Sequence, residues 1–412
     1  MTRNSEIDVE DNTPLLSSSN SVQNPIVGAT SYESLYHIVC VVAGTGLLQI
    51  PYAFSQAGWI GALLLIASAF VNWYTGNLII KCLNHKGKRL EGYPHIGEAA
   101  FGKFGYYMVS FFYNTAMGGT VCLYLILSGL NLAELVGYFT QQQWMTIVAL
   151  LLLVPYLTLK TLKEVGIVSF MGALASVLVV FIVIIVGSMD YINYTDKVSH
   201  DWANPRAFGS VLGTLCFSYG GNYVYPEVQR SMAKPQNFRK VLTWSMVSIS
   251  VMYLLVGIIG YLVYGNLTVS PILLNLPPGL AKTFSLGIIT FHVIFACPIL
   301  LTTISCDMER ALEIKADLGR NLLRIGILSF ITIVSITLPF FSDLMNLVGA
   351  VSNTMLIFVL PVVCDWVLNP DQKIGQRAFG VLILLIGISG GSVGTYDALL
   401  GLYRDIQDSY NY

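Results

Sequence analysis

Eleven runs of about 20 apolar, nearly uncharged residues limit what this chain can fold into. A helix of about 20 apolar residues crosses the hydrocarbon core of a bilayer. Transmembrane strands have about ten residues and alternate apolar with polar positions, which these runs do not do. The sequence therefore predicts an all-α integral membrane protein with eleven transmembrane helices, over residues 34–54, 58–81, 105–136, 144–160, 164–188, 207–230, 241–264, 283–306, 325–341, 344–367 and 378–403.

The overall composition leads to the same class. Of the 412 residues, 55% are hydrophobic and 11% are charged, whereas soluble domains have about 25% charged residues. This excludes nucleic-acid binding, a secreted disulfide scaffold and a cytosolic enzyme as first interpretations. The seven cysteines lie in the apolar runs or at their ends and show no metal-ligand spacing, so neither a metal nor a cofactor is expected.

Lysines and arginines are distributed unequally between the loops. With the N-terminus in the cytosol, eighteen of the 22 lie on the cytosolic side, as the positive-inside rule requires. Two Asn-x-Thr sequons, at Asn193 and Asn266, fall on the opposite side, where glycosylation takes place. The sequence thus predicts a cytosolic N-terminus and a C-terminus on the lumenal or extracellular side.

The two ends of the chain are polar. Residues 1–31 predict a disordered cytosolic tail, and residues 404–412 form a short tail on the other side. Asp11, Leu15 and Leu16 match an acidic dileucine sorting signal, which adaptor complexes read on endosomal, lysosomal and vacuolar proteins. A chance match to so short a motif is the alternative.

The first and sixth apolar runs both contain glycines followed by a proline. Gly46 and Pro51 are five residues apart, and so are Gly221 and Pro226. Both residue types weaken helices, and unwound backbone persists in a membrane only around a cavity or inside protein. Each half of the chain, 34–188 and 207–367, holds five runs, so the two halves run in opposite directions. Matched breaks in inverted repeats predict a transporter binding site; close helix packing at the glycines is the alternative.

The chemistry of such breaks suits a zwitterion. Free N–H groups after Gly44 can hold a carboxylate, and free carbonyls near Ser218 can hold an ammonium group. The unwound segments contain no acidic residue, which favours neutral amino acids. The predicted substrate site comprises Ala43, Gly44, Thr45, Gly46, Leu47, Ser218, Tyr219, Gly220, Gly221 and Asn222.

The residues around both breaks resemble those of a known family. The segment from Gly44 to Phe54 with the following Gly58-Trp59, and the segment from Gly220 to Gln229, resemble the first and sixth helices of amino acid/auxin permeases. The similarity extends over residues 32–403 and is nearest to vacuolar and lysosomal amino acid transporters, relatives of the vesicular inhibitory amino acid transporter. It implies the inverted five-plus-five fold of the APC superfamily, an eleventh helix at 378–403, and amino acid transport coupled to an ion gradient.

The resemblance also bears on the coupling ion. Sodium-coupled relatives have an asparagine where this chain has Cys40, whereas proton-assisted relatives have a histidine at the position of His37. Histidine suits a proton carrier, although His37 also lies where it can simply reach the interface. Glu227 is a second candidate, or a partner of Arg230 in a gate. A sodium site remains the alternative, with hydroxyl groups from Thr302, Thr303 and Ser305.

The sequence therefore predicts a secondary active transporter of neutral amino acids, coupled to protons, in the membrane of an acidic organelle such as a vacuole or lysosome. Sodium-coupled transport and an amino acid sensor are the alternatives, and a plasma-membrane location is less favoured. The chain has no protease, hydrolase or nucleotide-binding motif, so we expect no enzyme activity. Its expected partners are the amino acid, protons and membrane lipid. His292, in the eighth run, is interpreted as a hydrogen-bonded interior histidine rather than a proton relay.

Overall fold

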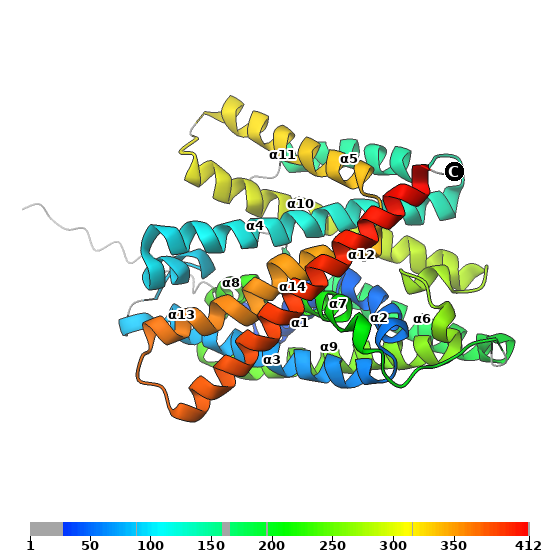
Figure 1. Ribbon diagram of the computed structural model, residues 1–412. Helices are drawn as coiled ribbons and strands as arrows, with labels where there is room; N and C mark the ends of the chain where they lie inside the picture. The colour runs from blue at the N-terminus through cyan, green and yellow to red at the C-terminus, as the bar shows by residue number, and fades with distance from the viewer. Residues whose placement is uncertain (1–27, 88, 159–164, 195–196, 315, 411–412) are drawn as a thin grey trace, which may run out of the picture.

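The structure is an all-helical bundle, shown in Figure 1 as a computed structural model. It describes residues 28–87, 89–158, 165–194, 197–314 and 316–410. The α-helices in these residues are α1 (Ser31–Val42), α2 (Ile50–Ala57), α3 (Ile60–Leu83), α4 (Tyr93–Val136), α5 (Gln141–Thr158), α6 (Val165–Tyr194), α7 (Phe208–Ser218), α8 (Tyr225–Ser231), α9 (Phe238–Tyr264), α10 (Leu280–Ala311), α11 (Asp317–Thr337), α12 (Phe341–Val348), α13 (Leu360–Leu368) and α14 (Ile374–Tyr410). Between them lie the 3-10 helices η1 (Thr45–Gln49), η2 (His85–Gly87), η3 (Pro205–Ala207), η4 (Asn222–Val224), η5 (Pro235–Asn237), η6 (Gly265–Leu267) and η7 (Ile272–Leu274), and the π-helices η8 (Gly349–Asn353) and η9 (Met355–Val359).

Eight helical segments of the described chain are long and apolar enough to cross a membrane. The number is nine if α1 and η1–α2, which meet at a bend of 44°, form one broken span. The sequence predicts eleven, and each predicted run contains helix. The two further runs correspond to α5, which begins with three glutamines, and to α7 and α8, which have 11 and 7 residues. The protein is therefore an all-helical, multi-pass membrane protein with eight or nine candidate spans.

The two broken helices lie side by side and run in opposite directions. At one end, the N–H of Ala29, just before α1, donates to the carbonyl of Ser231 at the end of α8 (2.8 Å). At the other end, the N–H of Asn204, before α7, donates to the carbonyl of Ala57 at the end of α2 (2.8 Å). The start of each broken helix thus lies beside the end of the other, so the two helices are antiparallel.

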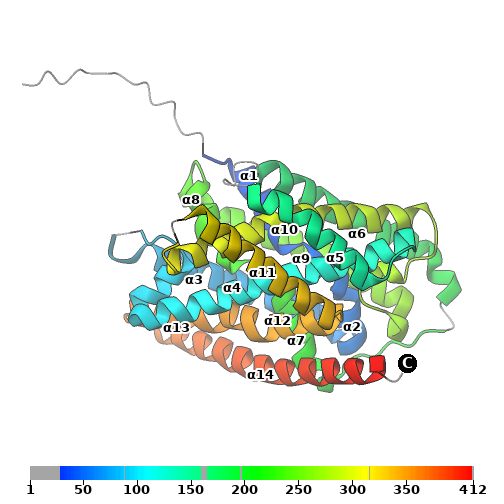
Figure 2. The same cartoon turned by 90° about the horizontal axis from the view of Figure 1, so that it is seen from above.

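The remaining helices enclose this central pair. α1 packs against α6 and α9, while α2 and η1 pack against α7 and α9. α10 lies against α4 and α6, and α14 runs along α7 and α12 at one edge of the bundle (Figure 2). Large side chains on the outer faces, such as Ile185 on α6 and Leu385 on α14, are more than half exposed. A bilayer would cover such apolar surface, whereas water would not.

A buried carboxylate ties α3 to α13. Asp365 is 3% exposed, and it accepts hydrogen bonds from Lys81 Nζ (2.9 Å), Gln372 Nε2 (2.7 Å) and Asn369 Nδ2 (2.7 Å). Charged groups are buried in proteins only when they are paired in this way. Near the other end of the bundle, Gln49 Nε2 donates to Ser342 Oγ (2.6 Å) and so joins η1 to α12. Polar contacts thus hold the helices together toward both ends.

The folded chain begins slightly earlier than the predicted tail boundary at residue 31. Thr30 is the N-cap of α1 and forms a capping box with Glu33, so residues 28–30 belong to the helical domain. Asp11, Leu15 and Leu16 lie outside the described residues. Asn193 is exposed at the end of α6 and Asn266 is exposed after α9. Tyr194 packs against Tyr264 at this point (ring centroids 5.1 Å apart), so both sequons lie at the same end of the bundle.

Candidate functional site

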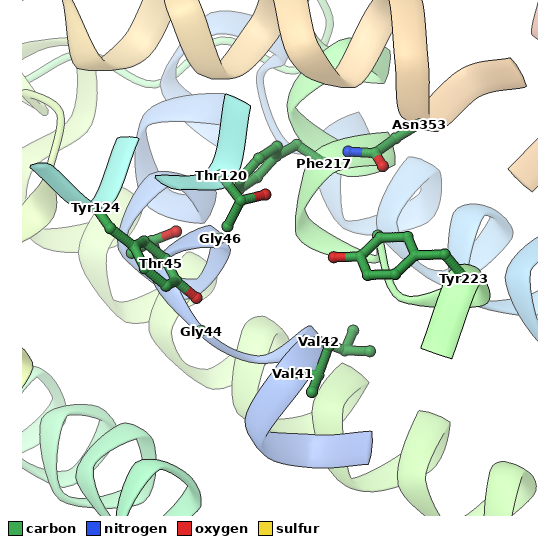
Figure 3. Close-up of a pocket in the computed structure, with 11 residues that line it drawn as sticks. Val41, Val42, Gly44, Thr45, Gly46, Thr120, Tyr124, Phe217, Tyr223 and Asn353 are labelled. Atoms are coloured by element: carbon green, nitrogen blue, oxygen red, sulfur yellow. The ribbon is translucent and has the colours of Figure 1, made fainter. Parts of the chain in front are cut away.

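A small cavity lies between the two breaks. It is lined by Val41, Val42, Gly44, Thr45, Gly46, Thr120, Tyr124, Phe217, Gly220, Tyr223 and Asn353. All of these residues except Val41 are buried, so the cavity lies inside the protein. Figure 3 shows Tyr223 on one side with its hydroxyl directed inward, Thr45 and Tyr124 opposite it, and Asn353 and Thr120 nearby. Its free volume of about 20 Å³ holds about one water molecule, so an amino acid fits there only when the surrounding helices move apart.

The first break separates α1 from η1. The last carbonyls of a helix have no hydrogen-bond donors within the helix. Here side-chain hydroxyls supply the missing donors. Tyr253 of α9 donates its hydroxyl to the carbonyl of Val42 (2.8 Å), and Ser176 of α6 donates to the carbonyl of Ala43 (3.2 Å). Gly44 is the N-cap of η1 and has no side chain to cap it. The first N–H groups of η1 therefore lie at the cavity without a side-chain cap, which suits an anionic group.

The second break separates α7 from η4 and is stabilised in a similar way. The carbonyl of Ser218 accepts a hydrogen bond from the same Tyr253 hydroxyl (2.7 Å). The carbonyl of Tyr219 accepts one from Asn72 Nδ2, and Asn72 Oδ1 in turn accepts one from the hydroxyl of Tyr225 (2.9 Å). Each of these two carbonyls thus already accepts a hydrogen bond from a protein donor.

Glycines let the two breaks touch. A Cβ atom at Gly46 would lie 2.6 Å from the Cα of Ser218, and one at Gly221 would lie 2.5 Å from Cγ2 of Val42. Real Cβ atoms do not approach other atoms this closely. The hydroxyl of Ser218 also donates to the carbonyl of Gly46 (3.4 Å). Glycine at these positions therefore allows direct backbone contact between the two broken helices.

An unpartnered acceptor and uncharged walls characterise the cavity. Asn353 ends the π-helix η8 and is 2% exposed, and its Oδ1 has no hydrogen-bond partner in the described chain. A buried acceptor without a partner is costly, so a ligand donor would stabilise it. None of the described lining residues is charged, and no cluster of metal-ligating side chains occurs among the described residues. The polar groups present are hydroxyls, an amide and backbone groups.

The structure brings part of the predicted substrate site to this cavity. Gly44, Thr45, Gly46 and Gly220 line it. The other predicted residues surround it: Ala43 and Leu47 are fully buried behind the wall, and Ser218 and Gly221 make the contacts between the breaks. The remaining two bond to neighbouring helices, Tyr219 to Ser250 Oγ (2.9 Å) and Asn222 Nδ2 to Thr75 Oγ1 (3.4 Å).

The predicted coupling residues do not line the cavity. His37 is partly buried in α1, two turns before Gly44. Glu227 lies in the first turn of α8 and is exposed. Tyr223, a wall residue of the cavity, packs edge-on against Tyr113 of α4 (ring centroids 5.7 Å apart).

The alternative sodium residues face different neighbours. Ser305 shares a hydrogen bond with the hydroxyl of Tyr156 on α5. Thr303 donates to the carbonyl of Ile299 in its own helix (2.9 Å). Thr302 is buried, and its hydroxyl has no partner among the described residues. The structure therefore directs Ser305 and Thr303 to partners other than the α1 break.

Several wall residues are not among the predicted ones. Thr120 and Tyr124 come from α4, four residues apart and on one helix face. Asn353 lies in an apolar run. Because polar groups inside membrane spans are rare and functional, this amide could have been chosen from the sequence as a candidate site residue. The pairing of α4 and η8 with the breaks depends on tertiary packing and has no local sequence pattern.

Comparison with known proteins gives consistent matches over this chain. Residues 28–399 match the family described as transmembrane amino acid transporter protein. Amino acid transporter AVT1I of Arabidopsis thaliana is 30% identical over 408 residues, covering 93% of this chain and 97% of the relative. AVT1J of the same plant is 29% identical over 398 residues (93% and 92%). Amino acid transporter ANT1, also from Arabidopsis thaliana, is 25% identical over 430 residues (94% and 96%).

Proposed function

The chain belongs to the family of transmembrane amino acid transporter proteins, and from this premise we propose that it carries neutral amino acids across the membrane of an acidic organelle, driven by protons. The substrate is held in the cavity between the breaks of α1–η1 and α7–η4. The observation that carries this proposal is the contact of two antiparallel broken helices around an internal cavity. Broken helices that meet in this way form the substrate sites of many secondary transporters.

The wall groups fit the two charges of an amino acid. Its carboxylate binds at the N-terminus of η1, where the Gly44–Gly46 backbone lies at the cavity and the helix dipole favours negative charge. Its ammonium group donates to Oδ1 of Asn353, which has no described protein partner. Asn353 thus adds an acceptor to the carbonyls near Ser218 that the sequence favours, two of which already accept hydrogen bonds from Tyr253 and Asn72.

Uncharged walls favour a neutral side chain on the substrate. Phe217, Val41 and Val42 offer apolar contacts, and no described wall residue supplies a counter-ion for a lysine or glutamate side chain. Burying an unpaired charge there would be strongly unfavourable. We therefore assign neutral amino acids as the substrate class.

Transport then follows from the inverted arrangement. We assign eleven spans in two inverted groups of five with a final helix over 378–403. The group that contains α1–α2 and α7–α8 moves relative to the surrounding helices and opens the cavity alternately to either side. The sorting signal at Asp11, Leu15 and Leu16 and the family resemblance favour an acidic organelle, whose proton gradient supplies the driving force.

Uptake into proteoliposomes tests this function. Purified protein is reconstituted without sodium, a pH gradient is imposed in either direction, and radiolabelled alanine, leucine, glutamine, lysine and glutamate are compared. We expect uptake of neutral amino acids in response to one direction of the gradient. Uptake that requires sodium would show that sodium, and not the proton, is the coupling ion, and the transporter assignment would remain. Binding without uptake under any gradient would instead favour the sensor function.

Replacing Asn353 by leucine tests the proposed ammonium partner. Leucine has a similar size but offers no acceptor, so we expect the KM for uptake to rise about tenfold, which corresponds to about 1.4 kcal/mol of lost binding. Ser352→Ala is a matched control, because Ser352 is also buried with an unpartnered hydroxyl but does not line the cavity. Equal KM values in N353L, S352A and wild type would exclude Asn353 from the site.

A further inference from the structure

His292 occupies an unusual position in the core. It lies on α10, is 4% exposed, and packs against α6 and α1. A Cβ atom at Gly172 of α6 would lie 2.5 Å from Nδ1 of His292 and 2.5 Å from Sγ of Cys40. The imidazole and the α1 side chain therefore meet over a glycine that leaves room for both. Cys40 lies one helical turn before Gly44, a wall residue of the cavity.

The ring nitrogens of His292 have no hydrogen-bond partner in the described chain. The interpretation of this residue as a hydrogen-bonded interior histidine is thus wrong. The structure offers a contrast in His200, whose Nε2 lies 2.9 Å and 3.1 Å from the carbonyls of Tyr261 and Leu262. Buried polar groups without partners are rare and call for an explanation. An ionisable group inside a span is a functional candidate by default.

The titratable groups around His292 are neutral ones. Cys40 faces it from α1, and the hydroxyl of Tyr124 of α4 lies beside Gly44, one turn further along the chain. The nearest polar pair along the helix is Asn131 with Thr290, joined by a hydrogen bond of 3.0 Å.

The charged groups on the packed helices are engaged elsewhere. Lys282 of α10 pairs with Glu134 of α4 (2.8 Å), and Glu309 of α10 pairs with Arg324 of α11 (2.9 Å). On α6, Asp190 accepts from Asn193 (2.8 Å). None of these carboxylates forms an ion pair with His292 among the described residues, so a proton there would be a positive charge without a carboxylate partner.

We propose that His292 is the side chain that binds and releases the coupled proton, an inference that rests on proton-driven transport by the same site. In the conformation described here the imidazole is neutral and shielded. When α1 moves away from α10 and α6, water reaches the ring, and one ring nitrogen takes a proton from the more acidic side to form the imidazolium. The same N–H bond breaks when the site faces the opposite side, and the proton passes to water there.

The placement explains how proton and substrate are linked. Cys40, near the end of α1, lies beside the imidazole, and Gly44, four residues later in the break, lies at the cavity. A movement of the segment from Cys40 to Gly44 on substrate binding therefore changes the space and water around His292, and protonation changes the position of the segment. Such coupling is reciprocal, so the loss of the proton site must also remove the effect of the gradient on the substrate.

The test separates coupling from transport. Wild type, H292Q, H37Q and H200Q are reconstituted, using the member of the alanine, leucine and glutamine panel that wild type takes up fastest. Counterflow at equal pH on both sides measures transport without a proton gradient. Gradient-driven accumulation and proton flux, recorded with a trapped pH dye, measure coupling.

We expect H292Q to retain counterflow while accumulation and substrate-dependent proton flux fall about tenfold or more, and H200Q to behave as wild type. Gradient-driven accumulation and proton flux at wild-type levels in H292Q would overturn the proposal, as would their loss in H37Q alone. A wild type that transports but ignores the pH gradient would contradict the proposed proton coupling itself.

A second pair of variants keeps the test decisive if H292Q does not fold. G172A places a methyl group against His292 and Cys40, whereas G187A on the same helix meets nothing closer than Ile259 Cγ2 at 3.6 Å. We expect G172A to lose coupling and G187A to retain it. Identical coupling in these two variants would contradict the proposal.

Discussion

Replacing Gly46 by alanine is expected to abolish amino acid uptake. The added Cβ would lie 2.6 Å from the Cα of Ser218 and 2.9 Å from its Cβ and Oγ. Because the nearest of these atoms belongs to the backbone of the other broken helix, the clash is relieved only if the two breaks separate. Overpacking of this kind costs up to about 3 kcal/mol, which corresponds to a loss of uptake of roughly 100-fold. Initial rates of uptake into proteoliposomes measure it.

Gly118→Ala provides the matched control for this variant. Gly118 lies in α4, and no atom lies within 4 Å of a Cβ built there. We expect G118A to transport as wild type, and both proteins to elute as single species in detergent. Wild-type rates in G46A would show that direct contact of the breaks is dispensable. Aggregation of G46A alone would mean that the substitution impairs folding. Gly221→Ala would then be the test variant, because its Cβ would meet a side-chain atom, Cγ2 of Val42 at 2.5 Å, and not the backbone.

The second large effect is expected for Tyr253→Phe. The Tyr253 hydroxyl lies 2.8 Å from the Val42 carbonyl and 2.7 Å from the Ser218 carbonyl, so one phenol serves both breaks. Its single hydrogen is shared or alternates between the two acceptors. Phenylalanine would remove this shared hydrogen and leave a buried carbonyl without its donor, at a cost of about 1–3 kcal/mol. We expect a lower melting temperature and at least about tenfold slower uptake.

Tyr264→Phe is the control for this effect. Tyr264 lies on the same helix and is fully buried, but its hydroxyl bonds Asp190 Oδ2 (3.4 Å), away from the cavity. We expect Y264F to lose some thermal stability and to keep its rate of uptake. Equal loss of uptake in both variants would mean that Tyr253 acts through general stability and not through the breaks.

The breaks themselves were predictable from sequence. Glycines followed by a proline at equal spacing weaken a helix wherever they occur in an apolar run, and the odd number of runs in each half, five, predicts opposite directions. The structure shows the antiparallel contact: Ala29, before α1, bonds to Ser231 at the end of α8, and Asn204, before α7, bonds to Ala57 at the end of α2. The resemblance to amino acid/auxin permeases, drawn from the same residues, is confirmed by the family match.

Other features depend on distant parts of the chain. Tyr253 and Asn72 occupy carbonyls that the local sequence leaves free, because a break shows which groups lose helical partners but not which side chains replace them. The exposure of Glu227 depends in the same way on which face of α8 meets its neighbours. His292 differs from an ordinary interior histidine only by its lack of a described partner, which no sequence pattern reveals.

The most direct test of the central claim is an experimental structure of the protein with its best transported neutral amino acid at saturating concentration. We predict density for the ligand between Thr45, Tyr223 and Asn353, with the carboxylate at the N-terminus of η1 and the ammonium group at Asn353 Oδ1. Ligand density outside this cavity, with the space between the two breaks empty, would contradict the account.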